Sequence, residues 1–211
     1  MKSGFCVLWG RPNAGKSTLL NALLGRKHVI VSPRPQTTRH RITGVFHGDD
    51  YQIVFVDTPG IHAPKHKLGE SLVKTARGAL DDIECIVFVA DAADPPHDDD
   101  ERAAALLEKA TAPVLLALNK IDAARERNVH WEKRRAAFEA LRPFDQTFEV
   151  SALRGDGVAA LREAIRARLP EGDPYFPPEM LGDRSPEFHI AELIREQAMH
   201  QLHEEVPHSV A

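Results

Sequence analysis

The sequence predicts an α/β fold in which helices flank a mostly parallel β-sheet. Short apolar runs of strand length alternate with segments of helical length along most of the chain. The predicted strands are Phe5–Trp9, Ile53–Val56, Ile86–Ala90, Val114–Leu118 and Phe148–Val150. Strands that are joined by helices pair in parallel and are covered on both faces, because each helical connection returns over the sheet.

Length and charge limit the classes of function. With 211 residues, 43% of them hydrophobic, the chain can form one full α/β domain and a second, smaller structural unit. Its formal net charge is -4. Binding nucleic acid through bulk electrostatics needs a clustered excess of Lys and Arg, so any contact with RNA is expected to be local.

The cysteines and the apolar runs indicate a cytoplasmic protein. Cys6 and Cys85 both lie in apolar runs, where a thiol acts as a small buried hydrophobe more often than as a disulfide or metal ligand. No export signal is visible, and no apolar stretch approaches the roughly 18–20 residues of a membrane span. The use of cysteine as a buried hydrophobe fits a reducing cytoplasm.

The chain divides into three predicted parts. Residues 1–170 form the α/β domain, whose last helix carries apolar residues at helical spacing up to Leu169 and stops at Pro170. Residues 171–186 contain prolines and glycines that prevent a long helix or a central strand, which predicts an extended linker. Residues 187–211 include an amphipathic helix whose apolar face has no partner within its own segment. The apolar residues of this helix are Ile190, Leu193, Ile194 and Leu202.

Two further features have structural interpretations. The acidic run Asp98–Glu101 precedes an Ala/Leu-rich segment, and carboxylates favour the N-terminus of a helix, so we expect a helix start there; a metal site is the alternative. Trp9 is expected in the core of the sheet, and the alternative is contact with the surroundings of a nucleotide.

A glycine-rich loop follows the first predicted strand. The stretch G-R-P-N-A-G-K-S (Gly10–Ser17) matches G-x-x-x-x-G-K-[ST] and leads directly into a predicted helix, as the pattern requires. Its backbone N–H groups and the helix N-terminus would surround phosphate oxygens, Lys16 would reach the outer phosphates and Ser17 would coordinate Mg²⁺. The pattern predicts a P-loop NTPase fold. The predicted nucleotide-binding residues of this loop are Gly10, Arg11, Pro12, Asn13, Ala14, Gly15, Lys16, Ser17 and Thr18.

A second loop, D-T-P-G, follows the strand Ile53–Val56. An Asp at the end of a buried strand is costly unless it is paired or helps to hold a metal, and Asp57 is placed to hold Mg²⁺ through water. The amide of Gly60 would then meet the γ-phosphate. Taken alone, the pattern is more often an Asp that opens a turn before Pro59 and Gly60.

A third loop, N-K-I-D, indicates guanine as the base. Asn119, Lys120 and Asp122 emerge at the end of the buried strand Val114–Leu118, where open α/β sheets place their ligands. A carboxylate at Asp122 can accept hydrogen bonds from the N1–H and the exocyclic amine of guanine, whereas adenine offers neither donor there. Backbone N–H groups of a last loop would lie near the base. The residues of that loop are Ser151, Ala152 and Leu153.

Together these motifs resemble the Era family of bacterial ribosome-assembly GTPases, within the translation-factor class. The resemblance rests on the phosphate loop up to Asn21, P-Q-T-T-R-H-R-I (Pro35–Ile42), D-T-P-G-I-H, N-K-I-D, S-A-L and the tail D-R-S-P-E-F-H-I-A-E-L-I-R-E-Q. It implies GTP hydrolysis with Mg²⁺ held by Ser17, Asp57 and a switch I threonine, Thr38, with Thr37 as the close alternative. The residues it implies in catalysis are Lys16, Thr38, Gly60 and Asn13.

The resemblance also implies partners. Era-like proteins act in assembly of the small ribosomal subunit and bind the 3′ end of its 16S-type rRNA through a KH domain, which holds RNA with a G-x-x-G loop. The tail from Asp183 resembles the entry into that domain, but no G-x-x-G follows before Ala211. We therefore expect the chain to end inside the KH domain, and RNA binding is what the resemblance implies for the family. We expect a monomer, and peripheral association with the cell membrane is implied by resemblance alone.

Ile61 directly follows D-T-P-G, where some GTPases carry a glutamine that positions the attacking water. By resemblance, Asn13 is a candidate to hold a K⁺ ion that stands in for an arginine finger, a group worth roughly 10³ to 10⁵ in rate. The alternative is that Asn13 only supports the turn of the loop and that hydrolysis is slow and stimulated by a partner. Two other functions remain open: a nucleotide-dependent binding module with negligible turnover, and a related ribosome- or tRNA-associated GTPase.

Overall fold

The computed structural model describes residues 1–29, 42–57, 83–180, 182 and 194. Its strands are β1 (Lys2–Trp9), β2 (Ile42–His47), β3 (Tyr51–Asp57), β4 (Cys85–Asp91), β5 (Val114–Asn119) and β6 (Gln146–Glu149). Its helices are α1 (Lys16–Leu24), α3 (Asp98–Ala105), α4 (Ile121–Glu126), α5 (Trp131–Glu139) and α6 (Val158–Arg168).

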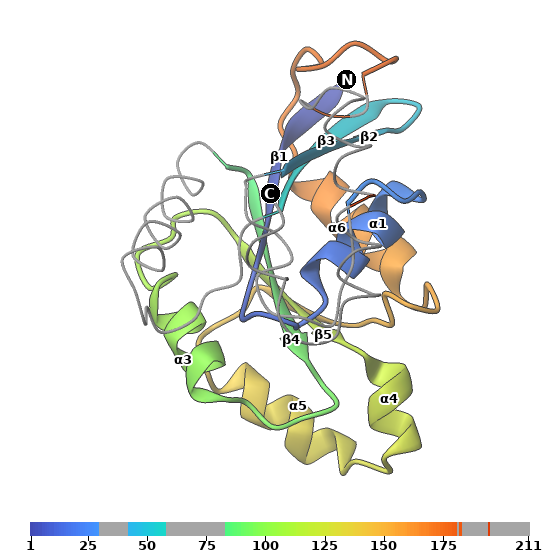
Figure 1. Ribbon diagram of the computed structural model, residues 1–211. Coiled ribbons are helices and arrows are strands. Elements are labelled where there is room, and N and C mark those ends of the chain that lie inside the picture. The colour runs from blue at the N-terminus through green and yellow to red at the C-terminus, as the bar shows by residue number, and fades with distance from the viewer. Residues whose placement is uncertain (30–41, 58–82, 181, 183–193, 195–211) are drawn as a thin grey trace.

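One six-stranded sheet, in the order β2-β3-β1-β4-β5-β6, forms the centre of the molecule (Figure 1). All neighbouring strands pair in parallel except β2, which pairs antiparallel with β3. The predicted α/β class and the mostly parallel sheet are therefore confirmed.

The edge strand β2 was not predicted. Its sequence, I-T-G-V-F-H, contains Gly44, and its apolar and polar residues alternate only weakly. It therefore lacks the continuous apolar pattern of the buried strands. It becomes a strand because β3 offers a free edge, with Ile42 opposite Asp57 and His47 opposite Gln52.

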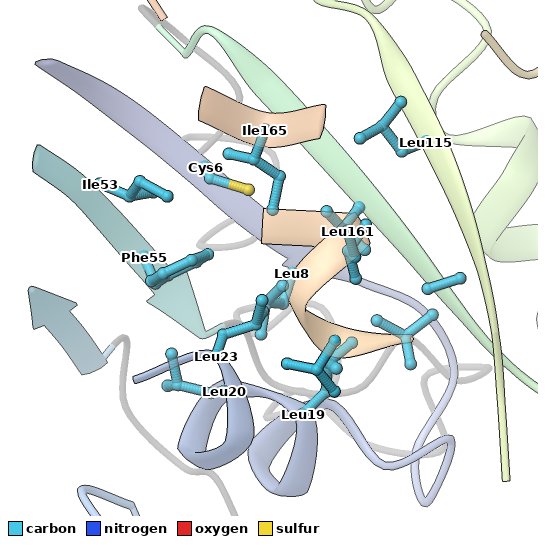
Figure 2. Close-up of a cluster of buried hydrophobic side chains, with 14 of the residues drawn as sticks. Cys6, Leu8, Leu19, Leu20, Leu23, Ile53, Phe55, Leu115, Leu161 and Ile165 are labelled. Carbon is cyan, nitrogen blue, oxygen red and sulfur yellow. The ribbon is translucent and has the colours of Figure 1, made fainter. Parts of the chain in front are cut away.

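Helices α1 and α6 cover one face of the sheet (Figures 1 and 2). The side chains on this face interdigitate with those of the two helices, and Cys6, Leu8, Leu20 and Ile165 are fully buried among them. Full burial of each leucine or isoleucine contributes roughly 1.5–3 kcal/mol to stability. This packing holds the start of α1, and with it the glycine loop, against the ends of the strands.

The opposite face packs against α3 and α5, because successive strand residues point to alternate sides. Trp9 is fully buried here, and its Nε1–H donates to the carbonyl of Ala103 in α3 at 2.8 Å, so the expectation of a core tryptophan is confirmed. The acidic run begins α3, where Asp100 and His97 form a capping box, which confirms the helix-start interpretation.

The two cysteines are free and buried, as expected. They face one another across β1 and β4. Burial, together with the neighbouring Cys85 thiol, raises the pKa of Cys6 well above its usual value, so this thiol stays protonated and unreactive. None of the helices in the described ranges has the length and apolar character needed to cross a bilayer.

The described part of the predicted linker lies against the sheet. The side chain of buried Gln52 on β3 accepts from the backbone N–H groups of Tyr175 and Phe176 at 2.8 and 3.0 Å, and donates to the Phe176 carbonyl at 2.7 Å. The Tyr175 ring packs edge-on against Phe5, with ring centroids 4.6 Å apart. Residues 171–180 and 182, the described part of this segment, contain no helix. The predicted domain boundaries stay predictions, because the residues after 182 lie, apart from 194, outside the described ranges.

Candidate functional site

The sequence motifs that the structure describes meet at the carboxyl edge of the sheet. In the strand register Leu8 of β1 lies opposite Asp57 of β3, and Asp91 of β4 lies opposite Asn119 of β5. Because these strands are parallel, the loops that follow them emerge side by side. The glycine loop, Asp57 and the N-K-I-D loop therefore share one edge.

Two glycines allow the phosphate loop to approach its neighbours closely. Gly10 has φ +144°, and a Cβ there would lie 2.4 Å from the Val89 carbonyl oxygen. Gly15 has φ +94°, and a Cβ there would lie 2.3 Å from Asn119 Nδ2. Both the left-handed backbone and the lack of space exclude a side chain, so the loop turns back tightly onto the start of α1.

Lys16 holds its ammonium group inside this loop. Its Nζ donates to the carbonyls of Gly10 and Arg11 at 3.1 and 2.9 Å. Burial lowers the pKa of Lys16 from 10.5 to about 8, although the nearby Asp57 carboxylate opposes the shift. A buried cation whose partners are neutral carbonyls can exchange them for phosphate oxygens, which compensate its charge better.

Ser17 and Asp57 come together beside the loop. The Ser17 hydroxyl donates to Asp57 Oδ2 at 2.9 Å, which brings a residue from α1 and one from the end of β3 to the same point. Both groups are hard oxygen donors of the kind that Mg²⁺ prefers, and one carboxylate plus a hydroxyl leaves positions for phosphate oxygens and water. The donor set fits the predicted metal. The other predicted residues of this centre, Thr38 (or Thr37) and Gly60, lie outside the described residues.

Asn119 connects three loops through its side-chain amide. Nδ2 donates to the Ala14 carbonyl of the phosphate loop at 3.0 Å, and Oδ1 accepts from the backbone N–H of Ala152 at 3.0 Å. The asparagine is buried, so both ends of its amide are satisfied within the protein. Sequence reasoning grouped Asn119 with base recognition, whereas the structure gives it the further task of holding the loops together.

Asp122 lies at the start of α4 and presents a carboxylate. Its Oδ1 is buried and accepts no hydrogen bond from the described residues, and its Oδ2 lies 3.9 Å from Nε of Arg154. Since a buried carboxylate oxygen without a donor is costly, this atom is suited to accept from a ligand. In the predicted loop Ser151–Leu153, Ser151 is buried, whereas Leu153 is 80% exposed.

Asn13 and Lys120 both adopt the left-handed backbone conformation, with φ of 62° and 63°. Nζ of Lys120 donates to the backbone carbonyl of Asn13 at 2.8 Å. Left-handed non-glycine residues cluster at functional sites, where the surrounding structure holds them in place. The side chain of Asn13 is exposed, so both of its predicted roles, turn support and ion binding, stay open.

Sequence reasoning missed two acidic residues of this region. Asp91 accepts from Nζ of Lys120 at 2.6 Å, and Asp100 lies 3.1 Å from Nε of Arg11. The nucleotide-binding role of Arg11 stays a prediction, and its side chain lies against these two carboxylates. One signal was available: Asp91, like Asp57, ends a continuous apolar strand.

A model of the family described as 50S ribosome-binding GTPase matches residues 5–120 of this chain. The chain is 46% identical over 215 residues to the GTPase Era of Thermotoga maritima, with 100% of this chain and 70% of the relative covered. It is 44% identical over 210 residues to the GTPase Era of Clostridium botulinum, with the same coverage.

Two solved structures extend the likeness to three dimensions. A crystal structure of Era in complex with MgGDPNP and nucleotides 1506–1542 of 16S ribosomal RNA matches with a TM-score of 0.90 and 38% identity, covering 99% of this chain and 70% of that one. A variant of Era from Aquifex aeolicus bound to GDP·AlF4⁻ matches with a TM-score of 0.90 and 39% identity, covering 99% and 71%.

Proposed function

This chain belongs to the Era family of GTPases, and on that premise we propose that its GTP hydrolysis serves assembly of the small ribosomal subunit and maturation of its 16S-type rRNA. The observation that carries the proposal is the likeness, over 99% of this chain, to an Era structure that holds both a GTP analogue and a 16S rRNA fragment. The local geometry agrees with it, since a phosphate loop and an acidic base-recognition motif lie at one edge of the sheet. We expect a cytoplasmic monomer that reaches the membrane surface only peripherally.

The residues of this chain perform four tasks in the reaction. Backbone N–H groups of Gly10–Ser17 and the ammonium group of Lys16 hold the phosphates, and Asp122 selects guanine. Ser17, Asp57 and Thr38 would hold Mg²⁺, which would neutralise phosphate charge. The amide of Gly60 would orient the γ-phosphate. GTP would thus order the switch segments, and hydrolysis would release them.

Stimulation by ribosomal subunits tests the partner. Hydrolysis of GTP by the wild-type chain is measured alone, with purified small subunits and with purified large subunits, at equal concentrations. We expect only small subunits to raise the rate, because 16S rRNA belongs to that particle. Stimulation by large subunits alone would contradict the proposal, and would favour the other ribosome-associated GTPases that share the matched family model.

Potassium is proposed as the second cation. Asn13 sits in a left-handed turn at the rim of the phosphate loop with an exposed side chain, where its amide oxygen can reach an ion beside the phosphates. Such an ion would stabilise the charge that develops during transfer, and this would compensate for a hydrophobic residue, Ile61, after D-T-P-G.

Turnover in K⁺ and in Na⁺ tests this role. We expect K⁺ to raise the rate of the wild type at least about tenfold over Na⁺, a fraction of what an arginine finger contributes. Asn13→Ala and Asn13→Gly should both lose the stimulation, and Gly retains the left-handed turn. Asn128→Ala is the matched control, because Asn128 is also left-handed and exposed but lies after α4. If Asn13→Gly keeps the K⁺ effect, the amide is not a ligand and Asn13 only supports the turn.

A further inference from the structure

Four charged side chains form a continuous chain behind the nucleotide loops. Nε of Arg11 lies 3.1 Å from Oδ2 of Asp100, and Nη2 of Arg11 lies 3.6 Å from Oδ2 of Asp91. The same Asp91 oxygen lies 2.6 Å from Nζ of Lys120. Asp91 is therefore shared by a cation of the phosphate loop and a cation of the guanine motif.

The two carboxylates are almost removed from solvent. The side chain of Asp100 is 0% exposed and that of Asp91 is 7% exposed. Asp100 also accepts from the backbone N–H of His97, and Asp91 accepts from the backbone N–H of Ala93 at 3.1 Å. A buried carboxylate is tolerated only when charges and donors compensate its lost hydration, so each depends on the cation beside it.

Both cations in turn connect to the backbone of the phosphate loop. Besides Asp91, Nζ of Lys120 contacts the carbonyl of Asn13, so Asp91 sets how Lys120 holds the rim of the phosphate loop. The carbonyl of Arg11 accepts from Nζ of Lys16, so the anchoring of the Arg11 side chain on Asp100 fixes the peptide that orients Lys16.

We propose that Asp91 and Asp100 are positioning residues for guanine nucleotides, which hold the phosphate loop and the N-K-I-D loop as one preorganised site. Neither residue contacts the nucleotide; each acts through Arg11 or Lys120. This inference rests on the GTP binding of the proposed function and deepens it. Preorganised groups bind with less ordering cost, so loosening them weakens binding even when the ligand contacts themselves remain.

Nucleotide affinity of Asp91→Asn and Asp100→Asn tests the proposal. We expect the dissociation constant for GDP to rise about tenfold or more in each variant, mainly through faster release. Asp94→Asn is the matched control, because Asp94 pairs with Arg127 at 2.8 Å in the same turn but on the surface, and its GDP affinity should stay within about twofold.

Double-mutant cycles separate positioning from general stability. Asp91→Asn is combined with Lys120→Met, and Asp100→Asn with Arg11→Met, and GDP binding is measured for all members. We expect each double variant to bind GDP about as weakly as its worse single variant. A merely structural role would lower the melting temperature of the nucleotide-free protein and leave the GDP dissociation constant of the folded fraction unchanged.

Several outcomes would overturn the inference. One is that folded Asp91→Asn and Asp100→Asn bind GDP as tightly as the wild type. Another is that the losses of GDP affinity are additive in both double-mutant cycles. Should Asp91→Asn fail to fold, Asp91→Glu replaces it in the test, because glutamate keeps the charge but shifts it by one methylene. If Asp91→Glu releases GDP at the same rate as the wild type, the proposal is contradicted. If the wild type itself binds no GDP, the proposed function fails, whereas a normal wild type with unaffected variants removes only this inference.

Discussion

Replacing Lys16 by methionine should lower the rate of GTP hydrolysis by at least about 10²- to 10³-fold, the effect of removing one positioned group that stabilises transition-state charge. The structure holds this ammonium group in place before any phosphate arrives, through the carbonyls of Gly10 and Arg11. Methionine retains a long apolar stem, so the buried volume is nearly kept. Single-turnover hydrolysis at saturating GTP measures the chemical step apart from binding.

A matched control and a pH series make this experiment specific. Lys133→Met removes an exposed lysine of α5 and should leave the rate unchanged. Because burial lowers the pKa of Lys16 to about 8 in the nucleotide-free protein, an increasing fraction of the lysine is neutral as the pH rises above that value. Phosphate binding favours the charged form, so GDP affinity of the wild type should fall between pH 8 and 9, while that of Lys16→Met should fall less. A Lys16→Met enzyme with near wild-type turnover would contradict the assignment.

Replacing Asp122 by asparagine should change the base that the protein accepts. The carboxylate can receive two hydrogen bonds from guanine, and charge-assisted bonds contribute roughly 1.5–3 kcal/mol each, so loss of this pairing should weaken GTP binding about 10²- to 10⁴-fold. An asparagine amide presents one acceptor and one donor. This pattern matches xanthine, which carries a carbonyl where guanine carries the amine, so xanthosine nucleotides should gain affinity.

Competition binding with GTP, xanthosine triphosphate and ATP measures this change. Glu132→Gln, at an exposed position of α5, is the control for loss of one negative charge and should keep the wild-type order of affinities. Equal weakening for all three nucleotides would mean that Asp122→Asn damages the fold of the loop and does not alter recognition. Lys16→Met and Asp122→Asn are also complementary, because Lys16→Met should lower the rate of hydrolysis without changing which base the protein prefers.

The sequence by itself determined the fold class and the chemistry of each loop. Continuous apolar runs predict buried parallel strands, since both faces of such strands are covered by helices, and the motifs follow those runs directly. Gly10 and Gly15 were predicted as phosphate-loop residues, and the structure shows why a side chain would not fit at either position. The switch residues Thr37, Thr38 and Gly60 stay predictions from sequence and resemblance.

Only the tertiary structure decided which distant residues support these loops. The edge strand β2 forms because β3 provides a pairing edge, and Gln52 ties β3 to residues beyond α6, which no local pattern indicates. Asp91 and Asp100 looked like a strand end and a helix start, yet they hold Arg11 and Lys120. Local propensity and motif spacing act over a few residues, whereas the compensation of a buried charge depends on whichever side chain the fold brings within about 4 Å.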